Sequence, residues 1–358
     1  MPTMPGIVSH LGGDILVGDG LLQTCIRPAP GAKVLFVDPM NPSVRGAGAP
    51  VSVSVVIPVY DKERYLRETI DSVLAQTRGP REIVVIDDGS TDRSAEVAAS
   101  YGSAIQLIRQ ANAGESSARN RGIDASSSDW IALLDGDDVW EPDRLERQFQ
   151  ALERSDSEPV CVYADAYLFD DSGQRIGEHR KPEYHAAPDW RVQMLCDWSI
   201  NPSSTLIRRS ALGDLRFPTE VQHSEDMIFL LELRERGPFL KVPETLMGYR
   251  RNEHNQTASP RHHLESVTTR WNWFRANEDK FDEAERLAVR ESLARQLMPT
   301  FSLARYTNRD MSLARECRRL YRDIHPDPSR GEISMTALIG PAWAYRLWDR
   351  VRTAGERG

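Results

Sequence analysis

DWIALLDGDDVWEPD, residues Asp129 to Asp143, contains an apolar run that ends abruptly in acidic residues. The apolar residues 131–134 predict a buried strand, and Asp135, Asp137 and Asp138 follow where that strand would leave the core. Carboxylates this close repel one another, so a cation or a hydrogen-bonding ligand would stabilise them. Mg²⁺ and Mn²⁺ suit such a site because each binds one or two carboxylates and keeps positions for water and phosphate. A polar turn before a helix explains the same residues, so this stretch alone leaves both interpretations open.

The sequence before this stretch supplies further strands with polar ends. VSVSVVIPVY, Val51 to Tyr60, is rich in β-branched residues and predicts a strand, and residues 63–76 follow with apolar positions at helical spacing. REIVVIDDGSTD, Arg81 to Asp92, repeats the pattern with a short apolar strand that ends in Asp87 and Asp88. The Ser-Thr-Asp run after these acids is a good helix N-cap, but a cap does not explain the doubled acid.

Strand and helix alternate from Val51 to about Leu168. Residues 104–108 predict another strand, and residues 114–122 lead through a short helix into the acidic strand end. This alternation predicts an α/β fold with a mainly parallel sheet flanked by helices. In such sheets ligands bind outside the carboxyl ends of the strands. The polar strand ends therefore predict one shared crevice.

Four strings of this sequence carry a family resemblance: VSVVIPVYDKERYLRETIDSVLAQT, EIVVIDDGSTDRS, NAGESSARNRGI and WIALLDGDDVWEPDRLE. In this order and approximate spacing they resemble the nucleotide-sugar-binding half of family 2 inverting glycosyltransferases. The resemblance covers about a third of the chain and continues more weakly to about Asn255. It implies the Rossmann-like GT-A fold, a nucleoside diphosphate sugar donor, and Mn²⁺ or Mg²⁺ as cofactor.

The resemblance also implies roles for individual residues. Asp88 would accept a hydrogen bond from the imide N–H of a uracil or thymine base, which suits an ionised acid because it only accepts. Asp137 would bind the metal, with Asp135 as the second acid and His254, in a later basic loop with Arg250 and Arg251, as a further metal or phosphate ligand. The residues implied at the nucleotide-sugar site are Pro58, Tyr60, Asp61, Glu63, Asp88, Arg119, Asp135 and Gly136. A helix-surface arginine paired with a nearby acid explains Arg119 equally well, and a solvated turn is the more ordinary role for Glu63.

The second half of the chain has to supply the catalytic base and the acceptor site. Glu225 and Asp226 directly precede an apolar helix and resemble the acidic pair at which the family carries its base, with Asp226 as the first choice and His223 as a weaker alternative. An acidic helix N-terminus, favoured by the helix dipole, explains the same pair. Ser203 and Ser204 resemble acceptor-contacting residues, although polar residues at a strand start are often only edge residues.

Four regions follow from these assignments. Residues 1–50 form an N-terminal arm or linker, residues 51–168 the nucleotide-sugar-binding half, residues 169–275 the acceptor-binding half, and residues 276–358 a helical C-terminal extension. The helices of the extension are expected to pack on the core or on a second subunit, which would make a homodimer.

Composition narrows the class of protein. With 358 residues, 40% of them hydrophobic, the chain can bury a large core, and no apolar run approaches the ~20 residues that span a bilayer. Four scattered cysteines predict reduced thiols and a cytoplasmic location, and the net charge of -8 argues against general nucleic-acid binding. Leu338 to Arg352 mixes tryptophan and leucine with arginine, as an interfacial helix does. A helix docked on protein has the same composition, so contact with the inner face of the membrane stays an alternative.

The sequence thus predicts a metal-dependent inverting transferase of the hexosyltransferase type. It would move one sugar from a nucleoside diphosphate sugar, UDP- or dTDP-linked, to a hydroxyl of a glycan, lipid-linked or small-molecule acceptor. The alternative is a glycosyltransferase-like nucleotide-binding or scaffold module without catalysis, which is disfavoured because Asp88, Asp135, Asp137 and Asp226 are all present.

Overall fold

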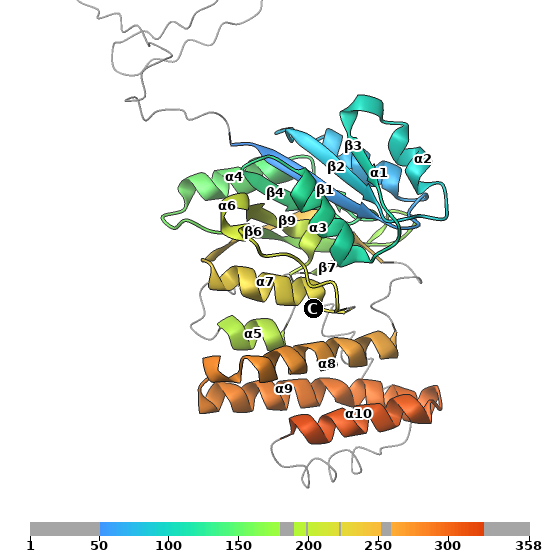
Figure 1. Cartoon of the computed structure of the whole chain (residues 1–358), viewed down its shortest axis with the longest axis vertical. Coiled ribbons are helices and arrows are strands. Elements are labelled where there is room, and N and C mark those ends of the chain that lie inside the picture. Colours follow the sequence, from blue (N-terminus) through green and yellow to red (C-terminus); the bar gives the residue numbers. More distant parts are fainter. Residues whose placement is uncertain (1–50, 180–189, 198–199, 222, 252–258, 326–358) are drawn as a thin grey trace, which may run out of the picture. The chain divides into compact units, whose positions relative to one another are not determined.

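The computed structural model describes residues 51–179, 190–197, 200–221, 223–251 and 259–325 (Figure 1). The predicted N-terminal arm, His254 and the segment Leu338 to Arg352 lie outside the described residues. The boundaries assigned to the four regions, the homodimer and the membrane contact therefore stay predictions.

One mixed β-sheet forms the centre of the described structure (Figure 1). Its strands are β1 (Val53–Val59), β2 (Glu82–Asp87), β3 (Gln106–Arg109), β4 (Trp130–Leu133), β5 (Val139–Trp140), β6 (Cys161–Phe169), β7 (Arg175–His179), β8 (Leu206–Arg208) and β9 (Phe239–Arg250). The order is β3-β2-β1-β4-β8-β6-β9-β5, with β7 paired on β6. β1 to β4 run parallel, as predicted, whereas β8 is antiparallel to both of its neighbours. The sheet therefore continues through both predicted halves, and the second half mixes strand directions.

Helices cover the sheet and extend away from it. They are α1 (Leu66–Leu74), α2 (Ser94–Ala99), α3 (Glu115–Ala125), α4 (Arg144–Arg154), α5 (Trp190–Cys196), α6 (Arg209–Leu212), α7 (Glu225–Glu235), α8 (Pro260–Ala276), α9 (Glu283–Ser302) and α10 (Met311–Ile324). Beyond α7 and α5, α8, α9 and α10 lie side by side as a separate helical layer (Figure 1). The predicted helical C-terminal extension is confirmed for the part of the chain that the structure describes.

β1 separates two hydrophobic cores because successive side chains of a strand point to opposite faces. Val55 packs in one buried cluster with Ile70 of α1. Val56 packs in the other with Ile123 of α3 and Phe229 of α7, and this second cluster continues into α8, α9 and α10. The extension thus shares its core with the helix that carries the predicted base.

α3 packs unusually close to the sheet. A Cβ placed on Gly122 would lie 2.2 Å from Cγ1 of Val56, so only glycine fits without a shift of the helix or the strand. The close approach holds α3 against β1 and β2. It places the beginning of the helix, with Glu115 and Arg119, beside the carboxyl ends of the strands. This is the packing on which the geometry of the candidate site rests.

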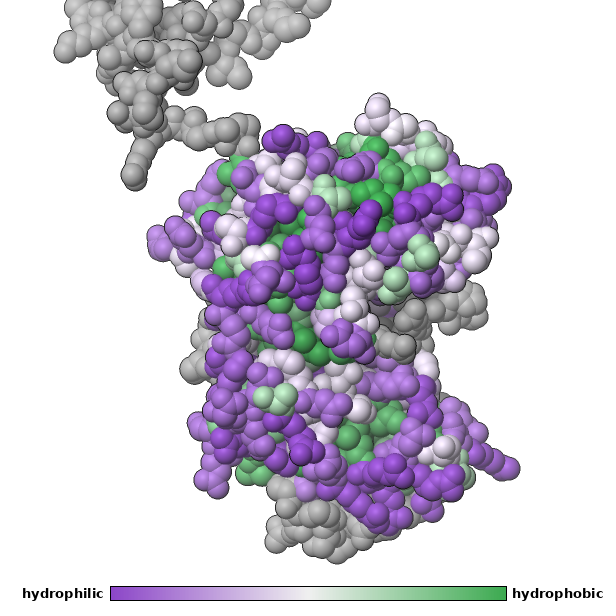
Figure 2. Space-filling view, in the orientation of Figure 1, coloured by the Kyte–Doolittle hydropathy of each residue, from purple (hydrophilic) through white to green (hydrophobic). Residues whose placement is uncertain are grey.

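The surface is mainly hydrophilic, with hydrophobic residues in small areas on the face shown (Figure 2). Among the described residues, no helix is both long enough and apolar enough to cross a membrane.

Candidate active site

Three parallel strands deliver the polar residues of the site. β1 ends before Tyr60, β2 ends in Asp87 and continues into Asp88, and β4 is followed by Asp135. Because β1 lies between β2 and β4, these exits meet at one edge of the sheet. The shared crevice predicted from the sequence is therefore present in the structure.

The acidic turn after β4 is held in place through its own backbone groups. Ser203 Oγ accepts a hydrogen bond from the Asp135 amide at 3.0 Å, and the Asp138 amide donates to the Asp135 carbonyl at 3.1 Å. A Cβ on Gly136 would lie 3.2 Å from the Pro58 carbonyl oxygen, so the turn lies tightly against the end of β1. Gly136 and Pro58, both predicted near the donor, thus bring the β1 and β4 exits together.

Asp138 is fully buried beneath this turn. Its Oδ1 accepts a hydrogen bond from the Arg250 amide at 3.1 Å, and its carbonyl accepts one from Thr69 Oγ1 at 2.8 Å. Burial raises the pKa of the Asp138 carboxyl well above its usual range, and Asp137 and Asp135 add to the shift. Asp138 therefore shapes the turn from below, while Asp135 and Asp137 remain partly exposed above it.

Arg250 also supports the turn. Its side chain is almost fully buried, its Nε donates to the Asp137 carbonyl at 2.9 Å, and its Nη2 pairs with Glu68. The sequence offered Arg250, Arg251 or His254 as phosphate-neutralising residues and a solvated basic loop as the alternative; in the structure the Arg250 guanidinium holds the backbone of Asp137. Arg251 is exposed, and its amide donates to the Phe169 carbonyl at 2.8 Å.

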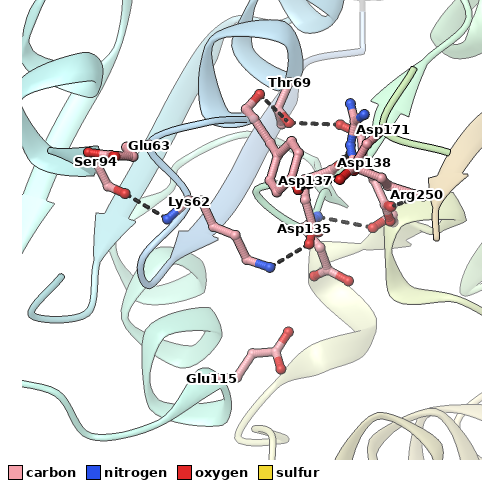
Figure 3. A network of polar contacts seen from close by, with 12 residues as sticks. Lys62, Glu63, Thr69, Ser94, Glu115, Asp135, Asp137, Asp138, Asp171 and Arg250 are labelled. Carbon is pink, nitrogen blue, oxygen red and sulfur yellow. Dashed lines mark hydrogen bonds and ion pairs between the residues drawn. The ribbon is translucent and has the colours of Figure 1, made fainter. Parts of the chain in front are cut away.

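Asp137 carries a partner that the sequence did not reveal. Lys62, in the loop after β1, extends its ammonium to Asp137 Oδ2 (Figure 3). Burial alone would lower the pKa of Lys62, but the charges of Asp137 and Asp135 outweigh burial and raise that pKa. A positive group therefore lies where the sequence predicted a cation.

Arg119 of α3 joins the two predicted halves of the site. Its guanidinium contacts Glu115, lies 2.8 Å from Asp135 Oδ1 and 3.3 Å from Glu225 Oε1, and stacks near the Phe217 ring. Only 3% of its side chain is exposed. Burial opposes the charged form, but these carboxylates outweigh it and raise the pKa of Arg119. The predicted donor contact has little surface to act through, and the structure instead shows a buried cation between acids.

Glu225 and Asp226 begin α7, as predicted. The residue before them, Ser224, has φ 64°, in the left-handed region, so the chain turns sharply into the helix. Burial and the neighbouring Asp226 raise the pKa of the Glu225 carboxyl to about 8, although Arg119 opposes the shift. Glu225 and Asp226 thus share a raised tendency to hold a proton, and the choice of Asp226 as the base stays a prediction.

The β2 exit holds Asp88 in a full set of contacts. Its carboxylate accepts hydrogen bonds from Gln110 Nε2 at 2.7 Å, the Ala113 amide at 3.0 Å and the Gly114 amide at 2.8 Å. Asp88 therefore fixes the loop that starts α3. Only 3% of Asp88 is exposed, so in this conformation the carboxylate has little surface for the predicted base contact, and that role stays a prediction.

The loop after β1 carries the remaining residues predicted at the nucleotide. Tyr60 is 44% exposed, which leaves its ring accessible beside the crevice. Asp61 Oδ1 accepts from the Thr91 amide at 2.7 Å, and Glu63 Oε2 accepts from the Arg93 amide at 2.9 Å. Asp61 and Glu63 thus tie the β1 exit to the β2 exit while remaining exposed.

Ser203 and Ser204 lie elsewhere than the sequence suggested. Both have no exposed surface. Ser203 holds the Asp135 amide, and Ser204 Oγ donates to the Asn201 carbonyl at 2.8 Å. A residue without exposed surface cannot touch an acceptor in this conformation, so Ser203 supports the acidic turn from within and Ser204 stabilises its own turn through Asn201. His223, the weaker base candidate, pairs through Nε2 with Glu265 at 2.7 Å.

The side chains of the site include carboxylates that suit a divalent cation. Within the described ranges, no three His, Cys, Asp or Glu side chains are arranged to hold a metal ion by themselves. Mg²⁺ and Mn²⁺ do not need such a set, because one or two carboxylates suffice when substrate phosphates supply other ligands. Asp137 and Asp135 provide these carboxylates, and an ammonium already pairs with Asp137. The residues present fit the ion.

Glu115 and Lys62 belong to the site but were not predicted from the sequence. Glu115 and Arg119 are spaced i, i+4 on a helix, a pattern that favours an ion pair and could have been read. Lys62 gave no such signal, because its partner lies 75 positions away in sequence.

Known proteins with similar sequences belong to one family of enzymes. Residues 54–216 match the model of the family described as glycosyl transferase family 2. ExoW, a succinoglycan biosynthesis protein of Rhizobium meliloti, is 34% identical over 203 residues, which cover 50% of this chain and 62% of that protein. The chain spans about half the length of the curated relatives that it matches.

Two solved structures share the fold. S. aureus TarS 1–349 in complex with UDP-GlcNAc has a TM-score of 0.58 at 17% identity, covering 77% of this chain and 82% of that one. The mannosyltransferase PcManGT from Pyrobaculum calidifontis, in complex with GDP-Man and Mn²⁺, has a TM-score of 0.51 at 15% identity, covering 83% and 82%. These likenesses confirm the predicted GT-A fold class.

Replacing Arg119 by methionine tests the buried cation. Arg119→Met should lower the free energy of unfolding by about 3–5 kcal/mol, because Asp135 loses its buried counterion and Glu115 and Glu225 lose the buried donor that they contact. The loss should be larger at pH 8 than at pH 5.5, since protonation of acids with raised pKa values relieves their repulsion. Urea denaturation at both pH values measures it.

Arg121→Met is the matched control, because it removes the same charge from an exposed position on the same helix. It should change stability by at most about 0.5 kcal/mol. Equal effects of the two variants at both pH values would show that the Arg119 network contributes nothing specific.

Proposed function

The domain that spans residues 54–216 belongs to glycosyl transferase family 2, and from this premise we propose that the protein is a metal-dependent inverting glycosyltransferase. It moves one sugar from a nucleoside diphosphate sugar, UDP- or dTDP-linked, to a hydroxyl of a glycan, lipid-linked or small-molecule acceptor. The observation that carries the proposal is one network: Arg119 links the acidic turn after β4 to the acidic start of α7. Donor-side and acceptor-side acids thus meet in one place.

The donor side recognises nucleotide and phosphate. Asp88 would accept a hydrogen bond from the base N–H with the one acceptor position that its three protein contacts leave, which requires a local opening because only 3% of the residue is exposed. The exposed Tyr60 ring lies at the neighbouring strand exit. Asp137, with Asp135, would hold Mn²⁺ or Mg²⁺, which would neutralise the negative charge that develops on the departing diphosphate. The mannosyltransferase of P. calidifontis was solved with Mn²⁺ and GDP-Man, which supports this use of the fold.

The acceptor side removes a proton. Asp226 takes the proton of the attacking hydroxyl as general base. Glu225, whose pKa is raised to about 8 by burial and by Asp226, stays protonated at neutral pH and adds no second negative charge there. A single displacement with the base opposite the leaving diphosphate inverts the configuration at the sugar carbon. Arg119 positions Asp135 and Glu225 relative to each other rather than reacting itself.

Metal-dependent donor binding tests the proposed function. With Mn²⁺ present, UDP- or dTDP-sugars should raise the melting temperature of the wild type, because ligands that bind the folded state stabilise it. Asp137→Asn should lose the Mn²⁺-dependent part of that rise, since a neutral amide holds the ion poorly. A thermal-shift screen of nucleoside diphosphate sugars with Mn²⁺ and with EDTA measures both.

Asp156→Asn serves as the control, because it makes the same change at an exposed loop position. It should behave as the wild type. The proposal fails if no sugar nucleotide stabilises the wild type, or if EDTA and Asp137→Asn leave the stabilisation intact.

Asp226→Asn distinguishes an enzyme from a catalytically inactive binding module. The amide is nearly isosteric, so donor affinity in calorimetry should stay close to that of the wild type. Turnover should fall by a factor of about 10²–10⁴, the usual contribution of a general base, and the acidic limb of the kcat profile should disappear. Nucleoside diphosphate release with an acceptor present measures kcat.

Glu225→Gln is the informative companion. Because Glu225 is protonated at neutral pH, this variant should keep much more activity than Asp226→Asn at pH 7. The reverse order of the two variants would move the base to Glu225. Wild-type turnover in both would leave the acidic pair as a helix terminus only.

A further inference from the structure

Lys62 is held in a fixed place next to the acidic turn. Its amide donates to Ser94 Oγ at 2.7 Å, and its carbonyl accepts from the amides of Tyr65 and Leu66, both at 2.9 Å. Its side chain packs beside Gly136, whose ideal Cβ position lies 3.4 Å from Lys62 Cγ. The backbone that starts α1 and the glycine of the acidic turn therefore direct this side chain along the crevice.

The ammonium at the end of that side chain contacts Asp137 Oδ2, with Asp135 and Glu115 as further acids around it (Figure 3). One third of the Lys62 side chain and 16% of the Asp137 side chain are exposed, so solvent screens the pair only in part. The oxygen that Lys62 contacts belongs to the carboxylate best placed to bind a divalent cation. A dication on Asp137 and an ammonium on the same carboxylate would repel each other.

We propose that Lys62 is an internal counterion that occupies the Asp137 carboxylate in the metal-free protein and competes with the divalent cation for it. The inference rests on the proposed function, because it takes Asp137 as a metal ligand. It adds a device that weakens binding of the metal alone. Lys62 would leave Asp137 when a divalent cation binds there, and its ammonium would then be available to pair with an incoming diphosphate.

The competition has a thermodynamic consequence. A group that binds Asp137 in the free protein and leaves it in the loaded protein lowers metal affinity by the free energy of the lost pair. Removing the ammonium should therefore strengthen metal binding. A lysine that does not contact Asp137 would affect the metal only through the weaker repulsion between its more distant charge and the dication.

The test measures Mn²⁺ alone with the full chain, using the electron paramagnetic resonance signal of free Mn²⁺. Lys62→Met keeps the aliphatic stem and removes the charge. It should bind Mn²⁺ about five- to tenfold more tightly than the wild type, the range expected for loss of one partly exposed ion pair. A gain of affinity cannot arise from failure to fold.

Two further variants identify the site. Arg147→Met removes one positive charge from α4, where Arg147 pairs with Asp143 and Glu244, and should leave Mn²⁺ affinity unchanged. Asp137→Asn in the Lys62→Met background should abolish the gain, because the carboxylate for which the two cations compete is then absent.

Equal or weaker Mn²⁺ binding by Lys62→Met overturns the inference, and so does an equal gain in Arg147→Met, which would reflect net charge alone. If Lys62→Met binds Mn²⁺ as the wild type does while Asp137→Asn still loses metal-dependent donor binding, the counterion inference fails and the proposed function stands. If Asp137→Asn changes neither Mn²⁺ binding nor donor binding, both fail.

Discussion

Several carboxylates lie together at one edge of the sheet, and their mutual repulsion has to be offset. Two positively charged side chains, Arg119 and Lys62, offset it. Asp135, Asp137, Glu115, Glu225 and Asp226 lie around Arg119 and Lys62, so five carboxylates face two positive side chains. Arg119 is almost fully buried and contacts three of the acids. The raised pKa of Glu225 removes part of the excess negative charge at neutral pH. The net negative charge that remains in the crevice is the basis for the proposed divalent cation.

The fold brings these groups together through a few close contacts. Gly122 lets α3 lie against Val56 of β1, which places Arg119 beside the end of β4. Ser203 and Arg250 hold the acidic turn through its backbone, so the carboxylates of Asp135 and Asp137 are left to pair with Arg119 and Lys62. The serine and the arginine belong to the second half of the chain, so that half shapes the acidic turn supplied by the first half. Both predicted halves therefore contribute the contacts that fix the acidic turn.

The strand exits could be predicted because a parallel sheet places the carboxyl ends of its strands together, and apolar runs ending in Asp88 and Asp135 mark such exits in any sequence. Burial of polar side chains could not. Ser203 and Arg250 resemble surface residues in sequence, and only their backbone partners, 68 and 113 positions away, make them internal supports. The mixed second half was also hidden, since β8 has three residues and gives too short a pattern to show its direction. Lys62 escaped notice because a lysine after an aspartate reads as a solvated turn.

We propose that the acidic turn is a cation site in which the Lys62 ammonium occupies Asp137 when no metal is bound. A crystal structure of the full chain grown with Mn²⁺ and UDP, with anomalous scattering at the manganese edge, tests it directly. The account predicts manganese about 2.1 Å from an Asp137 carboxylate oxygen, in contact with the diphosphate, and the Lys62 ammonium moved away from Asp137. Manganese bound elsewhere, with the Lys62 to Asp137 pair intact, would contradict it.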